Sequence, residues 1–267
     1  MNASATMEVI ALNLQISVLV PVIFLSAKLM KGGKRGIFPA VFTFAMVGLM
    51  LSCLYNSLNS LLTQGDRMPF AADEIAECSM LLLLSAGLES MVREKEKIEI
   101  RELLFSIAFI GAHIVLWIAW SGEWIQDTLF GLPYVYFLYL NLRGVRRTNA
   151  LTSRENLIAV ISVSCIMITL LFTLWMEEDI APLIENIFHV PEFIIVAWLF
   201  WKSVRALRKE NAGEQALYLS FLCFLWSLLV TYMCGELCYS LALIINTATL
   251  PVMLLAMKKK ELQNDLR

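Results

Sequence analysis

The chain has 267 residues, of which 59% are hydrophobic and 16% are charged, with a formal net charge of −2 and a mean hydropathy of +0.70. Because soluble domains carry about 25% charged residues, this composition excludes a soluble globular fold. There is no polar or Gly/Pro-rich stretch long enough for a linker or a second domain. We therefore expect one membrane domain over 1–267, with a short tail at 258–267.

Nine apolar stretches are long enough to cross a bilayer as helices. Crossing about 30 Å of hydrocarbon at about 1.5 Å per residue takes about 20 residues. The run from Gln215 to Met257 would be about 64 Å long as a single helix, so we divide it at 234–238. The predicted helices are 8–30, 37–63, 71–92, 102–120, 124–142, 155–176, 183–203, 215–233 and 237–257.

The basic residues support this division independently of hydropathy. All of the 21 lysines and arginines except Arg67 follow the first, third, fifth, seventh or ninth predicted helix. Basic loops remain in the cytoplasm, so the N-terminus is expected outside and the C-terminus inside. Eight crossings would break this alternation. The predicted fold is an all-α, polytopic integral membrane bundle of about nine transmembrane helices.

Acidic residues are concentrated on the predicted outer side, where they would attract cations or a basic peptide. A structural role is also available, because a carboxylate near a helix start complements the helix dipole and the unpaired N–H groups. Six acidic residues fit that role in the predicted first turns: Glu8, Glu74, Glu77, Asp127, Glu185 and Glu236.

The predicted seventh helix carries Glu185, His189 and Glu192 on one stripe, because i, i+4 and i+7 share a helix face. Pro191 followed by Glu192 also resembles a helix start. From Pro191 onward, however, the apolar stretch offers only about 16 Å of helix, which is too short to span the membrane. The helix must therefore begin near residue 183, with Pro191 inside it and Glu192 about 12 Å below the outer boundary.

A carboxyl group at that depth is costly, and by default it faces the bundle interior and marks a ligand or proton site. Histidine side chains titrate near neutral pH, so His189, one turn before Glu192, and His113, in the predicted fourth helix, are the other candidates. The alternative is a broken or interfacial segment in which Glu192 caps a helix end. The two histidines show no metal-binding spacing, and we predict neither a metal site nor a cofactor.

Other polar residues in the apolar stretches have less specific interpretations. Small side chains at helical spacing usually let helices pack closely, as expected for Ser220, Cys223, Ser227 and Thr231. A second group could line a cavity or pack between helices: Asn56, Asn59, Tyr134, Tyr136 and Tyr139. Cys234 and Cys238 flank the last outer turn, where the sequence does not decide whether they form a disulfide.

The sequence contains no nucleophile, phosphate-loop or paired-acid motif, so catalysis is unsupported. We expect a multi-pass membrane sensor or regulatory receptor that binds a small cationic ligand or a proton in an outward-facing cavity around Glu192. In architecture alone it resembles the multi-pass input part of bacterial signalling proteins, a likeness that rests on no motif. One alternative is a small-solute or proton-coupled transporter using Glu192 and His113. Another is an intramembrane lipid-modifying enzyme, which requires His113, His189 and Glu192 to face one another.

The expected location is a cell membrane, the cytoplasmic membrane of a bacterium. The expected partners are the lipid bilayer and a small-molecule or cationic ligand. A second copy of the chain or a cytoplasmic signalling protein could bind the charged tail at 258–267, which could equally contact anionic lipid headgroups. Nucleic acid is not an expected partner.

Overall fold

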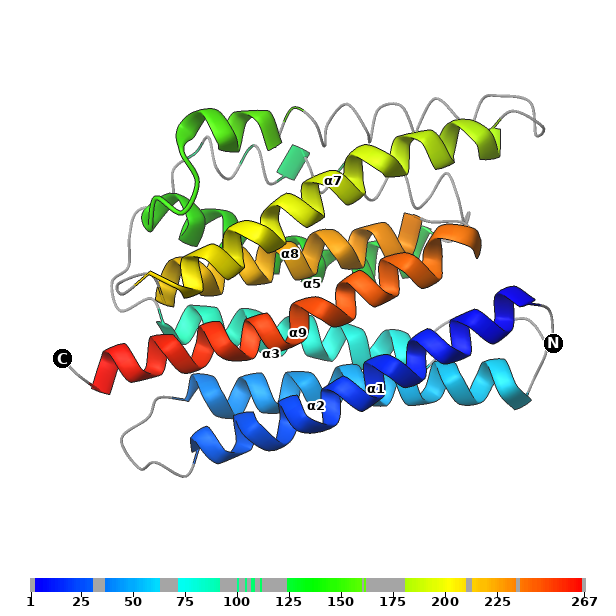
Figure 1. Ribbon diagram of the computed structural model, residues 1–267, viewed down its shortest axis with the longest axis horizontal. Coiled ribbons are helices and arrows are strands. Elements are labelled where there is room, and N and C mark those ends of the chain that lie inside the picture. Colours follow the sequence, from blue (N-terminus) through cyan, green and yellow to red (C-terminus); the bar gives the residue numbers. More distant parts are fainter. Residues whose placement is uncertain are drawn as a thin grey trace.

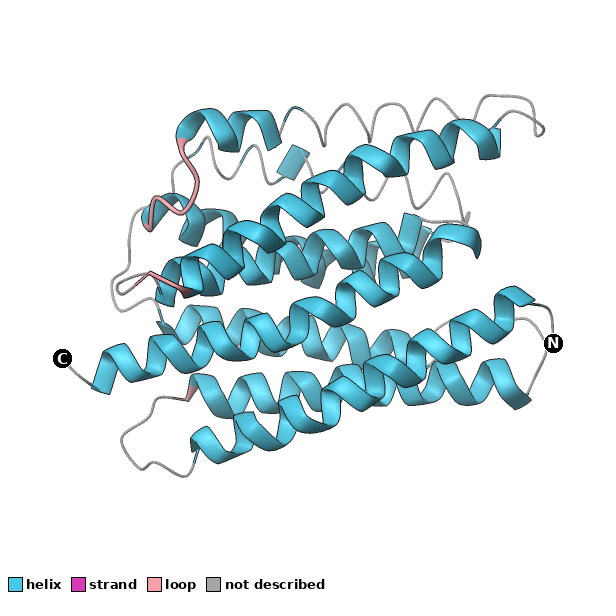
Figure 2. Cartoon of the chain, in the orientation of Figure 1, coloured by secondary structure: helices cyan, strands magenta, loops and turns pink. Residues whose placement is uncertain are grey.

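The computed structural model describes residues 3–30, 37–62, 72–91, 124–159, 161, 181–209, 213–233 and 236–265, together with five single positions between 100 and 111. All regular structure in these ranges is helical (Figure 2). A short helix at 153–159 accompanies seven long ones: α1 (Ala3–Met30), α2 (Phe38–Leu62), α3 (Ala72–Met91), α5 (Trp124–Arg147), α7 (Ala181–Leu207), α8 (Gly213–Met233) and α9 (Glu236–Asp265).

The long helices lie side by side along the longest axis of the molecule (Figure 1). In that view α1, α7 and α9 run in one direction, and α2 and α8 return in the other. The helix α8 packs against α5, α7 and α9, whereas α1 packs against α2 and α9. In its most apolar stretch, α8 is 89% buried inside the protein and α1 only 33%. Thus α8 is a central helix and α1 a peripheral one.

The two ends of the bundle differ in charge. Lys259 of α9 donates to the carbonyls of Ala206 and Leu207, at 3.4 and 2.5 Å, and to that of Lys209, so α7 and α9 end side by side. The start of α8 joins them, because Gly213 lies against the backbone of Lys260. We call this the basic end, since it holds the described basic residues Lys28, Arg143, Arg146, Arg147, Arg154, Lys202, Arg205, Arg208, Lys209, Lys258, Lys259 and Lys260. The opposite, acidic end holds Glu8, Asp73, Glu74 and Glu77.

Four of the described helices are long and apolar enough to cross a membrane: Thr6–Met30, Phe38–Leu62, Gly213–Tyr232 and Cys238–Gln263. Large apolar side chains cover the outside of the bundle, and Phe24 of α1, for example, is 60% exposed. An all-helical protein whose outer surface is apolar is adapted to hydrocarbon, where every backbone N–H and C=O must be paired within the helix. The fold is therefore that of a helical membrane protein.

The interior is closely packed toward the basic end. Phe38, Phe42 and Phe137 surround Phe221 of α8, with ring centroids 5.4 to 6.4 Å apart. A Cβ atom on Gly144 of α5 would lie 2.1 Å from the ring of Tyr218. Only glycine allows α5 to approach α8 this closely, which is how small residues join helices within a membrane.

Seven of the predicted helices are found, and all their bounds except the end of the last lie within five residues of the expected positions. The sequence-based division of 215–257 is confirmed, because α8 ends at Met233 and α9 begins at Glu236. The last helix is longer than the apolar stretch that predicts it and carries the charged tail as far as Asp265. The predicted helix at 102–120 and most of 155–176 lie outside the described residues.

Candidate functional site

His189 and Glu192 form a buried pair within α7. The Nδ1 atom of His189 lies 2.8 Å from Oε2 of Glu192, and the two side chains are 1% and 2% exposed. Residues three apart project from the same face of a helix, so the local sequence is sufficient to bring them together. The contact expected from the spacing is present. That the pair binds a ligand or a proton stays a prediction.

The helix continues through Pro191, which lies between the two residues of the pair. Proline has no N–H, so the carbonyl of Ile187 lacks its usual helical donor at this turn. The alternative in which the segment breaks and Glu192 caps a helix end is wrong, because α7 already begins at Ala181, about three turns earlier. The predicted start of the helix near residue 183 is confirmed.

Neighbouring helices enclose the pair. Tyr134 of α5 is within electrostatic range of Glu192, and its hydroxyl donates to the carbonyl of Leu225 in α8 at 2.9 Å. On the adjoining turn of α7, the carbonyl of Val196 accepts a hydrogen bond from Sγ of Cys223 at 3.5 Å. The pair therefore faces protein rather than lipid, as expected for an ionisable residue within a membrane.

One ring nitrogen of the pair does not take part in the contact between the two side chains. Nε2 of His189 is buried and has no hydrogen-bond partner among the described residues. When Nδ1 donates to the carboxylate, a neutral ring leaves a lone pair on Nε2, and a charged ring leaves a second N–H there. His113 lies outside the described residues, as does the side chain of Glu185. Among the described residues, no three His, Cys, Asp or Glu are grouped so that they could hold a metal ion.

A second polar site is a cavity of about 170 Å³ between α1, α2, α3, α8 and α9. Its lining includes the first turns of α3 and the last turn of α8, which places it toward the acidic end. We call it the five-helix cavity; it is lined by Leu12, Gln15, Leu49, Ser52, Cys53, Asn56, Asp73, Glu74, Glu77, Leu228, Thr231, Tyr232, Tyr239, Leu243 and Asn246.

Two buried amides connect the helices around the five-helix cavity. Nε2 of Gln15 donates to Oδ1 of Asn246 at 2.8 Å, and both side chains are 1% exposed. Asn246 in turn donates to Oγ of Ser227 at 2.9 Å and to the carbonyl of Phe224 at 3.3 Å, while Sγ of Cys53 donates to Oε1 of Gln15 at 3.1 Å. These bonds tie α1, α2, α8 and α9 together at the level of the cavity.

Carboxyl groups from α3 form another part of the wall. Glu77 accepts a hydrogen bond from Oγ of Ser52 in α2 at 3.0 Å and another from the hydroxyl of Tyr232 in α8. Asp73 is 1% exposed, whereas Glu74 and Glu77 are half-buried. Three carboxyl groups beside a polar space create a negative potential that favours a cation.

The first-turn interpretation of the acidic residues needs correction. Glu74 does lie in the first turn of α3, but Glu77 lies beyond it and takes part in the cavity wall. Glu8 and Glu185 also lie beyond the first turns, because α1 begins at Ala3 and α7 at Ala181. The first of these helices starts five residues before the position suggested by hydropathy, and the second starts two residues before it.

The five-helix cavity is not the one predicted around Glu192, because neither Glu192 nor His189 is among its lining residues. Among the residues that the sequence suggested as cavity-lining, Asn56 does line the five-helix cavity. Tyr136 does not, and its hydroxyl donates a hydrogen bond to Glu89 at 2.8 Å. Gln15 and Asn246 were missed. The available signal was the presence of amide side chains within apolar helices, which are costly in a membrane unless they are paired.

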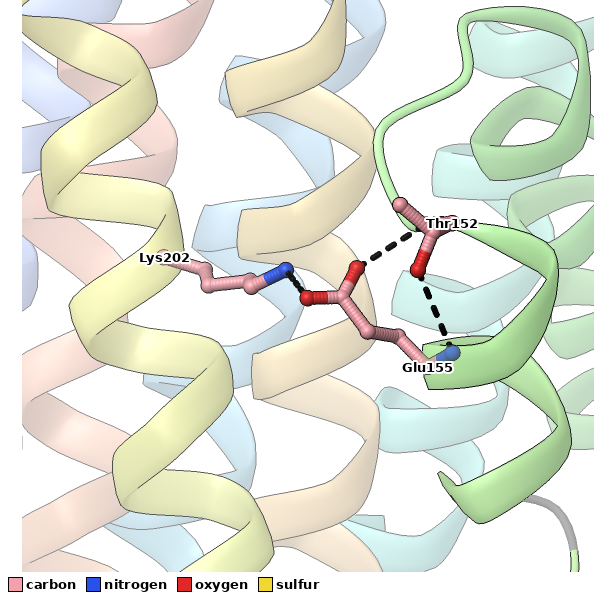
Figure 3. Close-up of polar contacts among 3 residues, drawn as sticks. All are labelled: Thr152, Glu155 and Lys202. Atoms are coloured by element: carbon pink, nitrogen blue, oxygen red, sulfur yellow. Dashed lines mark hydrogen bonds and ion pairs between the residues drawn. The ribbon is translucent and has the colours of Figure 1, made fainter.

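A further polar cluster lies at the basic end (Figure 3). Thr152 and Glu155 form a capping box at the start of the helix 153–159, with bonds of 2.9 and 3.3 Å between side chain and backbone N–H. Lys202 of α7 forms an ion pair with the same carboxylate. The hydrogen bond from Lys202, followed by that from the backbone of Thr152, lowers the pKa of Glu155, which lies in the exposed capping turn.

Comparison with known protein families, curated proteins and solved structures finds no match to this chain.

Proposed function

We propose that the protein is a multi-pass membrane sensor or regulatory receptor that binds a small cation in the five-helix cavity. The observation that supports this most directly is the cavity itself, whose wall combines the α3 carboxyl groups with the buried amides of Gln15 and Asn246. A concave site with a few convergent polar groups is the usual form of a small-molecule site. The proposed ligand site therefore lies near Glu77, and not around Glu192 as expected from the sequence.

We further propose nine membrane crossings, with the N-terminus outside and the C-terminus in the cytoplasm of a bacterial cell. The alternation of basic residues along the sequence supports this orientation, as does the position of the described basic residues at one end of the bundle. In this orientation the five-helix cavity lies in the outer half of the membrane. The tail of α9 is on the cytoplasmic side, where a signalling partner or a second copy of the chain could bind.

A proton-coupled or small-solute transporter is the second candidate function. The buried His189–Glu192 pair favours it, because paired ionisable groups within a membrane often belong to proton pathways. The receptor is preferred because the pair is fully enclosed and does not line the five-helix cavity. The intramembrane enzyme requires His113 to face the pair, and His113 lies outside the described residues.

The test is cation binding to the purified protein in lipid nanodiscs. Thermal unfolding would be followed in a panel of K⁺, Ca²⁺ and alkylammonium ions. A cation that binds only the folded state raises its stability by about 2.7 kcal/mol at one hundred times its Kd. We expect at least one cation to raise the Tm, and Glu77→Gln to weaken its binding about tenfold or more.

The matched control is Glu89→Gln, on the same helix, because Glu89 accepts a hydrogen bond from Tyr136 and does not line the cavity. The control should bind the cation as the unaltered protein does. Binding that is equally weakened in both variants, or a panel in which no cation binds, would overturn the proposal. Net uptake of the bound cation into proteoliposomes would show that the protein is a transporter rather than a receptor.

A further inference from the structure

The outward face of α7 carries one continuous stripe of exposed side chains. Residues three or four apart share a helix face, and exposed residues of α7 follow one another at that spacing. They are Ile187, Val190, Ile194, Ala197, Trp201, Arg205 and Arg208. The stripe is apolar as far as Trp201, and its large side chains there are 54% to 63% exposed. From Arg205 onward it is basic, so the stripe changes from apolar to cationic at the basic end of the bundle.

The two arginines of this stripe follow a tryptophan that fixes their level. The guanidinium carbon of Arg205 lies 5.2 Å from the centre of the Trp201 ring, where the ring attracts a cation. Tryptophan side chains favour the boundary between hydrocarbon and water. Arg205 is therefore held at the level of the lipid headgroups, and Arg208 lies one turn further on the same face. Each guanidinium group can donate two parallel hydrogen bonds to a phosphate.

The charge of this stripe is not neutralised within the described part of the chain. The neighbouring Lys202 forms an ion pair with Glu155, which brings the helix 153–159 beside α7 (Figure 3). Among the described residues, neither Arg205 nor Arg208 forms an ion pair with a carboxylate. Both side chains are exposed. They therefore present an uncompensated positive charge to an anion from outside the protein.

The apolar part of the stripe favours a lipid over a free anion. An inorganic phosphate would be attracted by the arginines alone and would gain nothing from the apolar side chains beside them. A phospholipid places its phosphate at the arginines and an acyl chain along Ile194 and Ala197. From Ile194 to Arg205 the helix rises about 16 Å. This is close to the depth of one leaflet, since the hydrocarbon of both leaflets is about 30 Å thick.

We propose that the basic end of α7 binds one anionic phospholipid, with Arg205 and Arg208 at its phosphate and an acyl chain along the exposed stripe. The inference goes beyond the proposed function, because this surface lies at the opposite end of the bundle from the five-helix cavity and does not depend on cation binding. A zwitterionic headgroup carries an ammonium group that two arginines repel. The site therefore selects lipids with a net negative charge.

The test is a titration of the purified full chain with phosphatidylglycerol and with phosphatidylcholine, followed by native mass spectrometry. A basic residue near the membrane surface strengthens the binding of anionic lipid about fivefold. We therefore expect one saturable site that binds phosphatidylglycerol about twenty-five times more tightly than phosphatidylcholine. The double variant Arg205→Gln with Arg208→Gln should remove this preference.

The matched control is Lys28→Gln with Lys258→Gln, which removes the same charge from exposed positions of α1 and α9 at the same end of the bundle. The control should keep the preference. Equal loss in both double variants would show a general attraction to the basic end and would overturn the site. Equal binding of the two lipids by the unaltered protein would overturn it even if the arginine variant does not fold. Displacement of the lipid by glycerol phosphate, which has no acyl chains, would overturn the role of the apolar stripe.

Discussion

The two buried polar sites of this protein are built in different ways. The His189–Glu192 pair belongs to one helix and is closed, since the two side chains contact each other and are 1% and 2% exposed. The five-helix cavity draws its polar groups from five helices and contains space that no side chain fills. A closed pair contributes mainly to the stability and orientation of its helix. An open cavity can change its contents, which is what binding requires.

The largest loss of stability is expected for variants of the His189–Glu192 pair. Replacing His189 by leucine leaves Glu192 buried without its partner, and breaking such a pair costs about 3 kcal/mol or more. Replacing both residues by leucine removes the unpaired group, so the double variant should recover most of this loss. The measurement is the free energy of unfolding in detergent micelles for both variants.

Cation binding by the double variant distinguishes a structural role of the pair from a role in ligand binding. If the pair is structural, the double variant binds the same cations in the five-helix cavity as the unaltered protein. A double variant that folds normally but loses all cation binding would show that the pair, rather than the cavity, is the ligand site. A single His189→Leu variant as stable as the unaltered protein would contradict the importance of the contact.

A smaller effect is expected at the amides of the cavity. Asn246→Leu leaves an N–H of Gln15 without its acceptor, at a cost of about 2 kcal/mol. It should also loosen α9 from α1 and α8, because Asn246 bonds to Gln15 in one and to Ser227 in the other. The Tm and the affinity for the cation are both expected to fall.

Thr249→Val is the matched control for this change. Thr249 is equally buried one turn further along α9, but its hydroxyl donates only to the carbonyl of Asn246 within the same helix. Its loss should cost less than about 1 kcal/mol. If Asn246→Leu costs no more than this control, the amides do not hold the walls of the cavity together.

These sites also mark where sequence reasoning succeeds. Helix positions follow from hydropathy, length and charge, all of which are local, and α2, predicted at 37–63, runs from Phe38 to Leu62. The contact of His189 with Glu192 follows from a spacing of three. Gln15 and Asn246 are 231 positions apart, so their bond depends on how α1 and α9 pack. No periodicity in either helix contains that information, and the cavity was therefore missed.

The smallest loss of stability is expected at the ion pair between Lys202, near the end of α7, and Glu155 of the helix 153–159. Ion pairs that solvent can reach contribute about 0–1 kcal/mol, and the side chains of Lys202 and Glu155 are 19% and 31% exposed. Glu155→Gln should therefore destabilise the protein by less than about 1 kcal/mol, and added salt should reduce the difference. Because the pKa of Glu155 is lowered in the folded protein, its contribution is present at neutral pH and is lost as the pH falls through that lowered value. Unfolding of Glu155→Gln and of the unaltered protein, measured between pH 7 and acidic pH, should therefore converge. A loss of stability as large as that of His189→Leu would show that burial does not explain the difference between the two ion pairs.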